Sequence, residues 1–111
     1  MQPLADQKCQ ACHSGTPKLS AEQIEDLQNQ LDNWLVSEGR QKLQKSIKTK
    51  DFQKALEKAN IIGRIAESEG HHPDLLVRWG ELRIELWTHA IDGLSEADFI
   101  LAAKIDRALG A

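Results

Sequence analysis

Three of the four histidines in this chain, His71, His72 and His89, lie close together in the sequence. Histidine has an ordinary pKa of about 6.5, so it is the side chain best suited to donate or accept a proton near neutral pH. Pro73 follows His72 and favours an extended backbone there, which would hold the first two rings at a helix-to-strand junction. The cluster therefore predicts proton-transfer chemistry carried by these three residues.

Two carboxylates have spacings that would let them orient these imidazoles. Glu67 precedes His71 by one helical turn, so its carboxylate could reach an imidazole nitrogen and fix the tautomer. Asp98 follows Ser95 at capping-box spacing, so capping a helix could be its whole role. Trp79 continues an alternating apolar pattern, and core packing explains it as well as stacking on a ligand does.

Capping signals and apolar periods predict the elements that must position these residues. Residues 1–19 contain both cysteines and show no period, which predicts an irregular arm before a single domain over residues 20–111. Ser20, Asp51 and Ser95 are candidate caps of three helices, of which the first reaches about residue 31. Alternating apolar residues predict two strand pairs, a hairpin over residues 34–49 and a second pair over residues 75–89.

The resulting order, α-β-β-α-β-β-α, predicts an α+β fold in which a four-stranded, antiparallel-rich sheet carries three helices on one face. The second and third strands flank a crossover helix, so that pair is a candidate for parallel pairing. His71 and His72 would leave the second helix while His89 would end the last strand. We therefore expect the three histidines to line one cleft.

Composition narrows the classes of partner. A formal net charge of -3 and a sequence pI of about 5.8 provide no long-range attraction for nucleic acid. No stretch approaches the roughly 20 apolar residues of a membrane-spanning helix, and the N-terminal sequence lacks a signal pattern. We expect a cytoplasmic protein that binds neither membrane nor nucleic acid directly.

The cysteines suggest two rival chemistries. The run Cys9-Gln10-Ala11-Cys12-His13 matches the haem-attachment pentapeptide, but attachment normally follows export. A structural zinc site normally has four ligands, and a second Cys or His pair is missing nearby. Zinc at the three clustered histidines is conceivable from composition alone. We expect neither haem nor metal, and the role of the cysteines stays open.

Seven restricted positions together resemble the signature of the pterin-4a-carbinolamine dehydratase family. They run from Glu67 through the His71-His72-Pro73 triplet and Trp79 to His89 and Asp98, with intervals of three, five, nine and eight residues. A match at many positions in a consistent structural context is far more specific than a short motif. The predicted order of helices and strands also resembles that family's fold from about residue 20 onward.

The resemblance implies a hydro-lyase that converts a 4a-hydroxytetrahydropterin to the quinonoid dihydropterin, recycling the cofactor of aromatic amino-acid hydroxylases. It implies acid roles for His71 and His89, pterin binding by His72, and orienting roles for Glu67 and Asp98. Trp79 would belong to the substrate-binding set. It further implies catalysis without cofactor or metal in a homo-oligomer, most simply a homodimer, with a tetramer as the alternative.

Two other functions remain open at this level. Some bacterial members of the family are linked to molybdopterin metabolism, and animal members also act as dimerisation partners of a homeodomain transcription factor. The sequence contains no feature that identifies such a protein-binding surface. Gene neighbourhood and an assay of the purified chain would discriminate between these functions.

Overall fold

The computed structural model describes residues 3–9 and 15–110 and confirms the α+β class. Its helices and strands follow the predicted order. They are α1 (Ala21–Gln28), β1 (Leu35–Val36), β2 (Leu43–Lys48), α2 (Phe52–Glu69), β3 (Asp74–Arg78), β4 (Glu81–Leu86) and α3 (Glu96–Leu109). Short 3-10 turns are formed by Leu4–Asp6, Glu38–Arg40 and His89–Ile91.

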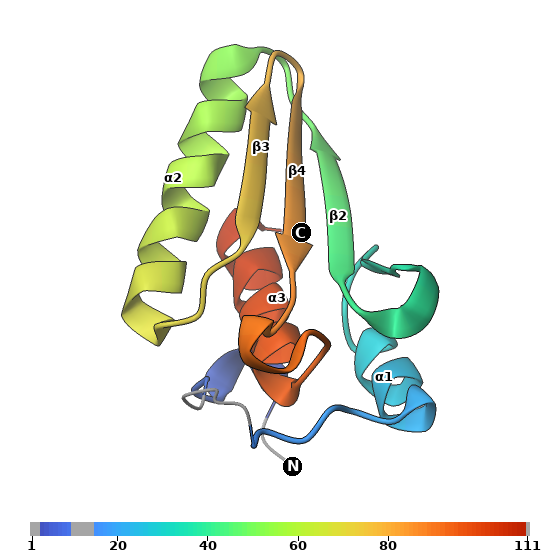
Figure 1. Ribbon diagram of the computed structural model, residues 1–111. Helices are drawn as coiled ribbons and strands as arrows, with labels where there is room; N and C mark the ends of the chain where they lie inside the picture. Colours follow the sequence, from blue (N-terminus) through green and yellow to red (C-terminus); the bar gives the residue numbers. More distant parts are fainter. Residues whose placement is uncertain (1–2, 10–14, 111) are drawn as a thin grey trace.

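The four strands form one sheet in the order β1-β2-β4-β3, and every neighbouring pair is antiparallel. The candidate parallel pairing of the second and third strands was wrong. β2 and β3 do run in the same direction, but β4 lies between them and pairs with both (Figure 1). The tight turn at Gly80, where φ is +82°, returns β4 directly beside β3 and so fills that central position.

The predicted caps begin and end the helices. Ser20 and Gln23 form the expected capping box of α1, and the Asp51 side chain accepts the backbone N–H of Lys54 at the start of α2. α2 ends at Gly70, whose φ of +65° is a left-handed conformation that glycine adopts at little steric cost. α1 is shorter than its apolar pattern suggests, because it stops at Gln28 and turns follow.

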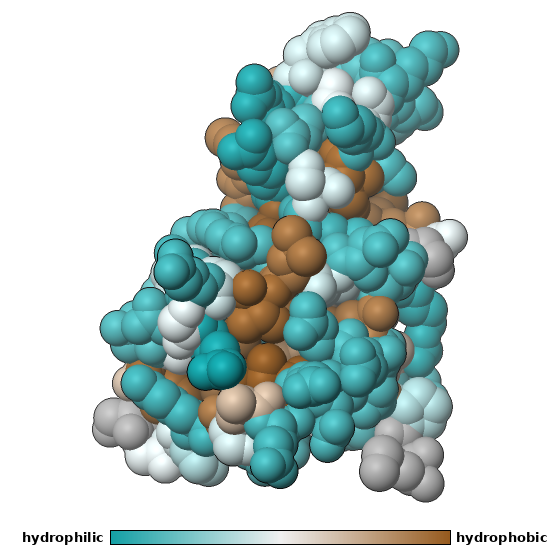
Figure 2. All heavy atoms as spheres, turned by 90° about the vertical axis from the view of Figure 1, so that its right-hand side faces the viewer, coloured by the Kyte–Doolittle hydropathy of each residue, from teal (hydrophilic) through white to brown (hydrophobic). Residues whose placement is uncertain are grey.

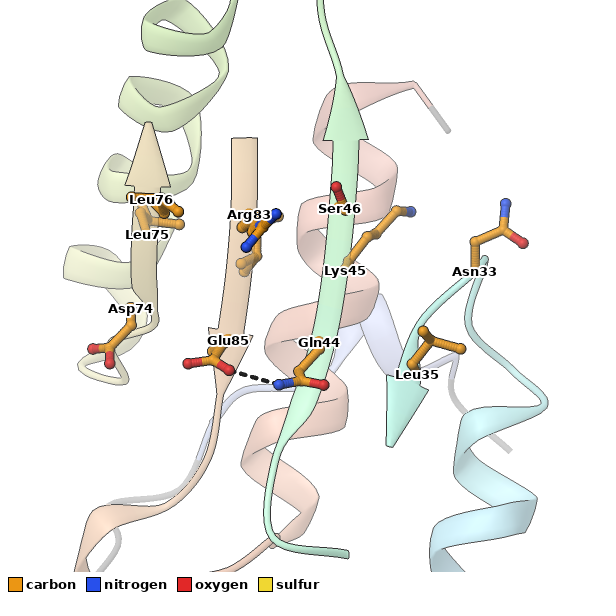
Figure 3. Close-up of a pocket in the computed structure, with 11 residues that line it drawn as sticks. Asn33, Leu35, Gln44, Lys45, Ser46, Asp74, Leu75, Leu76, Arg83 and Glu85 are labelled. Carbon is orange, nitrogen blue, oxygen red and sulfur yellow. Dashed lines mark hydrogen bonds between the residues drawn. The ribbon is translucent and has the colours of Figure 1, made fainter. Parts of the chain in front are cut away.

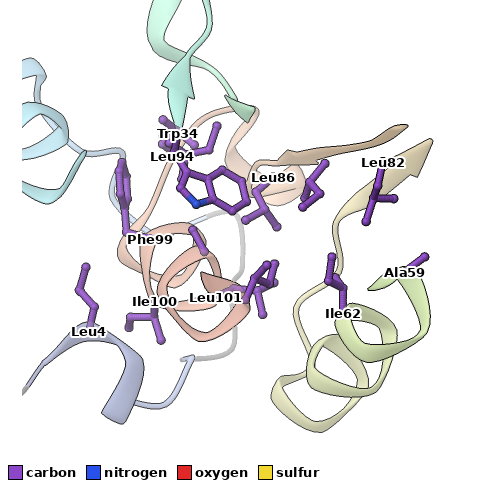
Figure 4. Close-up of a cluster of buried hydrophobic side chains, with 14 of the residues drawn as sticks. Leu4, Trp34, Ala59, Ile62, Leu82, Leu86, Leu94, Phe99, Ile100 and Leu101 are labelled. Atoms are coloured by element: carbon purple, nitrogen blue, oxygen red, sulfur yellow. The ribbon is translucent and has the colours of Figure 1, made fainter. Parts of the chain in front are cut away.

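One hydrophobic core lies between the sheet and the helices. Alternation along β4 places Leu82, Ile84 and Leu86 on the inner face, where all three are fully buried. Phe99 of α3 and Ile62 of α2 meet them from the other side, as the cluster in Figure 4 shows. The opposite face of the sheet carries mostly polar and charged side chains together with the exposed Leu35 and Leu76, and none of the described helices covers it (Figure 1).

The described part of the N-terminal arm packs against α3. Leu4 is only 7% exposed and belongs to the core cluster. The Lys104 ammonium donates to the carbonyl of Ala5 at 3.0 Å, and Arg107 pairs with Asp6. These contacts connect residues far apart in the sequence, so the arm contributes to the packing of the domain although it lacks a regular period.

The described surface is mostly polar. Seen from the side of β2 and α1, it carries a band of apolar side chains within a polar surround (Figure 2). Among residues 3–9 and 15–110, no helix combines the length and apolar character needed to cross a membrane.

Candidate active site

The buried carboxylate of Asp98 is the centre of the site. Its Oδ1 lies 2.6 Å from Nε2 of His71, and its Oδ2 accepts the Thr88 hydroxyl at 2.8 Å and the backbone N–H of Ser95 at 3.0 Å. An ionised carboxylate can only accept hydrogen bonds, so Nε2 of His71 carries a proton. Asp98 therefore caps α3 with one oxygen and holds an imidazole with the other.

His71 is placed by the end of α2. Gly70 turns the chain out of the helix, and the backbone N–H of His71 still donates to the carbonyl of Ala66 at 3.3 Å. The residue is 9% exposed and its ring points inward to Asp98. With Nε2 engaged by the carboxylate, Nδ1 is the ring nitrogen that can exchange a proton with a ligand.

Glu67 binds a different histidine from the one expected. Its carboxylate accepts from Nε2 of His72, not from His71, because the left-handed Gly70 ends the helical spacing on which that expectation depended. The side chains of His72 and Glu67 are 58% and 78% exposed, so solvent and a ligand can both reach this pair. Glu67 thus orients an exposed imidazole and Asp98 a buried one.

His89 lies in a 3-10 turn beyond β4, which ends at Leu86, so the expectation that it ends the strand was wrong. A bridge between Thr88 and Gly93 closes this turn, with the N–H of Thr88 donating to the carbonyl of Gly93 at 2.8 Å. His89 is exposed and its ring stacks on Trp87, with ring centroids 4.2 Å apart. The exposed imidazole is held on one side by an aromatic surface.

Thr88 connects the two parts of the site. Its hydroxyl donates to the carboxylate that holds His71, and the next residue along the chain is His89. The same oxygen lies 2.7 Å from the Ser95 hydroxyl, which completes a buried polar network. Sequence reasoning missed Thr88. The signal was its place between Trp87 and His89, because alternation directs a middle residue to the opposite side.

Trp79 does not lie beside the histidines within this chain. It occupies the turn between β3 and β4 and is 73% exposed. His72 comes just before β3 begins, whereas Trp79 follows its last residue, so the full strand separates the two. The alternating pattern that suggested core packing ends at Val77, and the turn carries Trp79 outward.

A hollow of about 710 Å³ lies on the uncovered face of the sheet, and it is not the expected histidine cleft. Figure 3 shows the polar and apolar side chains that line it, and none of the three histidines is among them. Its polar groups bond to one another, as in the 2.6 Å hydrogen bond from Gln44 to Glu85. The lining residues include Leu35, Gln44, Ser46, Leu76, Arg83 and Glu85.

Of the run from Cys9 to His13, the structure describes Cys9. Cys12 and His13 fall outside the described residues. Within the described ranges, no three or more His, Cys, Asp or Glu residues are grouped so that they could hold a metal ion. Burial, with the Glu69 carboxylate nearby, raises the pKa of Cys9 to about 12, so its thiol stays protonated near neutral pH.

Comparison with known proteins identifies the family. The family model described as pterin 4 alpha carbinolamine dehydratase matches residues 17–108. Proteins of Alkaliphilus metalliredigens and Rickettsia bellii carry the provisional name pterin-4-alpha-carbinolamine dehydratase. The first is 48% identical over 96% of this chain and 96% of its own length, and the second is 50% identical over 93% and 91%.

A solved structure from Brucella melitensis, described as a transcriptional coactivator/pterin dehydratase, has the same fold. It superposes with a TM-score of 0.77 at 27% identity and covers 83% of this chain and 98% of its own. The family model and the relatives both extend over the site built from His71, Asp98 and His89. This chain belongs to the pterin 4 alpha carbinolamine dehydratase family.

Proposed function

We propose that this protein dehydrates 4a-hydroxytetrahydrobiopterin, or a close bacterial counterpart, to the quinonoid dihydropterin and so recycles the pterin cofactor of aromatic amino-acid hydroxylases. The observation that carries the proposal is the buried pair of His71 and Asp98. The exposed His72 follows His71 in the chain, and the exposed His89 follows Thr88, whose hydroxyl donates to Asp98. Membership of the family supports the same chemistry.

The reaction needs two proton movements at one face of a small ring. The lone pair of N5 expels the 4a-hydroxyl as the C4a–O bond breaks, a proton goes to the departing oxygen, and N5 loses its own proton to a base. A positioned acid or base typically contributes about 100-fold to 10,000-fold to such a step. The 4a-hydroxyl can lie on either side of the pterin ring, and His71 and His89 act as the acids for the two sides. The histidine that has donated its proton is then neutral and can take the proton from N5.

Asp98 keeps His71 ready for this role. The carboxylate holds the proton on Nε2 and stabilises the imidazolium, which leaves Nδ1 to serve the substrate. The Thr88 hydroxyl and the Ser95 N–H hold the other carboxylate oxygen, so Asp98 cannot swing away. Its burial excludes water from the pair and strengthens the interaction.

His72 and Glu67 bind the pterin in this proposal. Both side chains are exposed and paired, and pterin rings present several N–H and carbonyl groups to such partners. Because the pair touches the ring in ground and transition states alike, it acts mainly on affinity. Catalysis requires no metal in this mechanism, so chelation should leave the rate unchanged.

We further propose that the protein works in the cytoplasm as a homodimer. β1 and β3 are the edge strands of the sheet, and edges of this kind pair readily with another chain. Phe52, Leu56 and Trp79 are exposed apolar side chains that a second copy would cover. Light scattering of the purified protein would give its mass, and a monomer at micromolar concentration would contradict the proposal.

A protein-binding role is a second candidate. The Brucella melitensis structure that shares this fold is described as a transcriptional coactivator as well as a dehydratase. The exposed Phe52 and Leu56 on α2 form a helix face that a partner helix would fit. A Leu56→Asp variant that keeps full dehydratase activity but loses a protein partner would separate the two functions.

The deciding experiment is an assay of the purified chain on freshly generated carbinolamine. Formation of the quinonoid product is followed by absorbance and the spontaneous rate is subtracted. We expect a rate proportional to enzyme concentration, unchanged by EDTA, and lost in a His71→Ala/His89→Ala variant that remains folded by circular dichroism. A folded wild-type chain that adds nothing to the spontaneous rate would refute the proposal.

A further inference from the structure

Trp87, Thr88 and His89 alternate in direction where the chain leaves β4. Thr88 has an extended backbone, with φ of -95° and ψ of 104°, so its neighbours on either side point away from it. Its own side chain points inward to the buried Asp98. Trp87 and His89 therefore share the outer side, where their rings stack with an interplanar angle of 28°.

The indole is anchored independently of His89. Leu43 of β2 pairs with Leu86 of β4, so Lys42 and Trp87 lie opposite each other one residue beyond that pair. The Lys42 ammonium lies 4.3 Å from the centre of the Trp87 ring, a cation–π contact. Trp87 is also half-buried and packs against the core cluster. The surface on which His89 rests is thus itself held in place.

Among residues 3–9 and 15–110, no hydrogen bond or ion pair restrains the imidazole of His89 as Asp98 restrains that of His71. The described contacts of its ring consist of the stack on Trp87, and the residue is exposed in a 3-10 turn. An exposed imidazole without such a contact samples several rotamers, and only some of them aim a ring nitrogen at a substrate. Asp98 restrains His71 by a hydrogen bond, whereas His89 has an aromatic face instead.

We propose that Trp87 is a positioning residue that holds the imidazole of His89 in the orientation needed to protonate the departing hydroxyl. This inference rests on the proposed dehydration. An aromatic stack of this kind restricts a side chain enough to change a rate by roughly three- to tenfold. Trp87 acts on turnover through His89, and substrate affinity depends on other groups.

The test compares Trp87→Leu, which removes the aromatic surface beneath His89, with Trp87→Phe, which keeps one. Each change is made in wild-type protein and in His89→Ala protein, and kcat and KM are measured on carbinolamine below the unfolding temperature of every variant. Because Trp87 packs on the core, Trp87→Phe also controls for lost stability.

We expect Trp87→Leu to lower kcat by about three- to tenfold with KM within about twofold, and Trp87→Phe to restore most of the loss. In His89→Ala protein, Trp87→Leu should have no further effect, because two residues that act as a unit are not additive. If Trp87→Leu lowers kcat equally in wild-type and in His89→Ala protein, the inference is overturned. A raised KM with unchanged kcat would also overturn it, because Trp87 would then be a substrate-binding residue.

Nuclear magnetic resonance separates this inference from the proposed function. Stacking on an indole shields the ring protons of His89, so their signals should move downfield in Trp87→Leu and much less in Trp87→Phe. If the wild-type chain shows no dehydratase activity but these shifts are present, the proposed function fails while the stack stands. Unchanged His89 signals in Trp87→Leu would refute the stack whatever the activity.

Discussion

The hydrogen bond between Nε2 of His71 and Oδ1 of Asp98, 2.6 Å long, joins the residue that follows the C-terminal glycine of α2 to the first turn of α3. Both partners are buried, and Thr88 and Ser95 occupy the second carboxylate oxygen. The bond therefore couples helix packing to the orientation of a candidate acid.

The histidines should separate by kinetic effect. His71→Ala/His89→Ala should lower kcat by about 100-fold or more with little change in affinity, because a group that transfers a proton only in the transition state acts on turnover. Each single variant should keep more activity if the substrate is a mixture of hydroxyl stereoisomers. His72→Ala should mainly raise KM. Steady-state kinetics of the double variant, the two single variants and His72→Ala tests this prediction. A folded double variant with near-wild-type turnover would contradict the mechanism.

Replacing Asp98 should have two distinguishable results. Asp98→Ala removes the acceptor for His71, Thr88 and the Ser95 N–H, so the free energy of unfolding should fall by about 2–4 kcal/mol. Asp98→Asn keeps the shape but presents an amide, which favours the wrong tautomer of His71, and kcat should fall by about 100-fold.

The exposed Glu96 in the same turn of α3 provides the control, and Glu96→Gln should change neither quantity appreciably. Urea unfolding measures the stabilities, and the carbinolamine assay measures kcat. Full turnover in a folded Asp98→Asn protein would show that the carboxylate only caps the helix.

The contact between Lys45 and Asp106 should be a major contribution to stability. Their charged atoms lie 2.8 Å apart with side chains 9% and 12% exposed, and Asp106 also accepts the Trp34 indole N–H at 2.9 Å. Asp106→Ala leaves an ammonium buried without its partner, so the free energy of unfolding should fall by about 3 kcal/mol. Glu57→Ala, which breaks an exposed pair with Lys54, should cost less than about 0.5 kcal/mol. Chemical denaturation measures both variants, and equal losses of free energy of unfolding in Asp106→Ala and Glu57→Ala would contradict this prediction.

The anchoring of the N-terminal arm should depend on pH. A hydrogen bond from the Cys9 backbone N–H, helped by the ammonium of Lys104, holds the pKa of Glu69 below its usual range. A carboxylate whose pKa is lower in the folded state stabilises the fold above its ordinary pKa. That contribution is lost as the pH falls through the lowered value.

Near neutral pH, the free energy of unfolding should therefore be larger for the wild-type protein than for Glu69→Gln. The difference between the two proteins should shrink below about pH 4. Glu57→Gln, on the exposed side of the same helix, should show no such change with pH. A difference between wild type and Glu69→Gln that stays constant from about pH 7 to about pH 3 would show that the carboxylate is not coupled to folding.

The elements of this fold were predictable because their signals are local. Ser20 and Asp51 satisfy backbone N–H groups within a few residues of themselves, and Gly70 ends α2 through its own conformation. The alternation of Leu82, Ile84 and Leu86 follows from the two-residue period of a strand. Such effects act over a few residues, so the sequence by itself determined the order of helices and strands and the family signature.

Contacts between distant segments were decided only by the tertiary structure. Spacing suggested that Glu67 would hold His71, but the turn at Gly70 directs His71 inward to Asp98 and leaves Glu67 to His72. Periodicity made core packing one of two explanations for Trp79, yet the return of the chain to form β4 puts it on an exposed turn. A local pattern states which face a residue prefers, whereas its partner depends on which segments the packed core brings together.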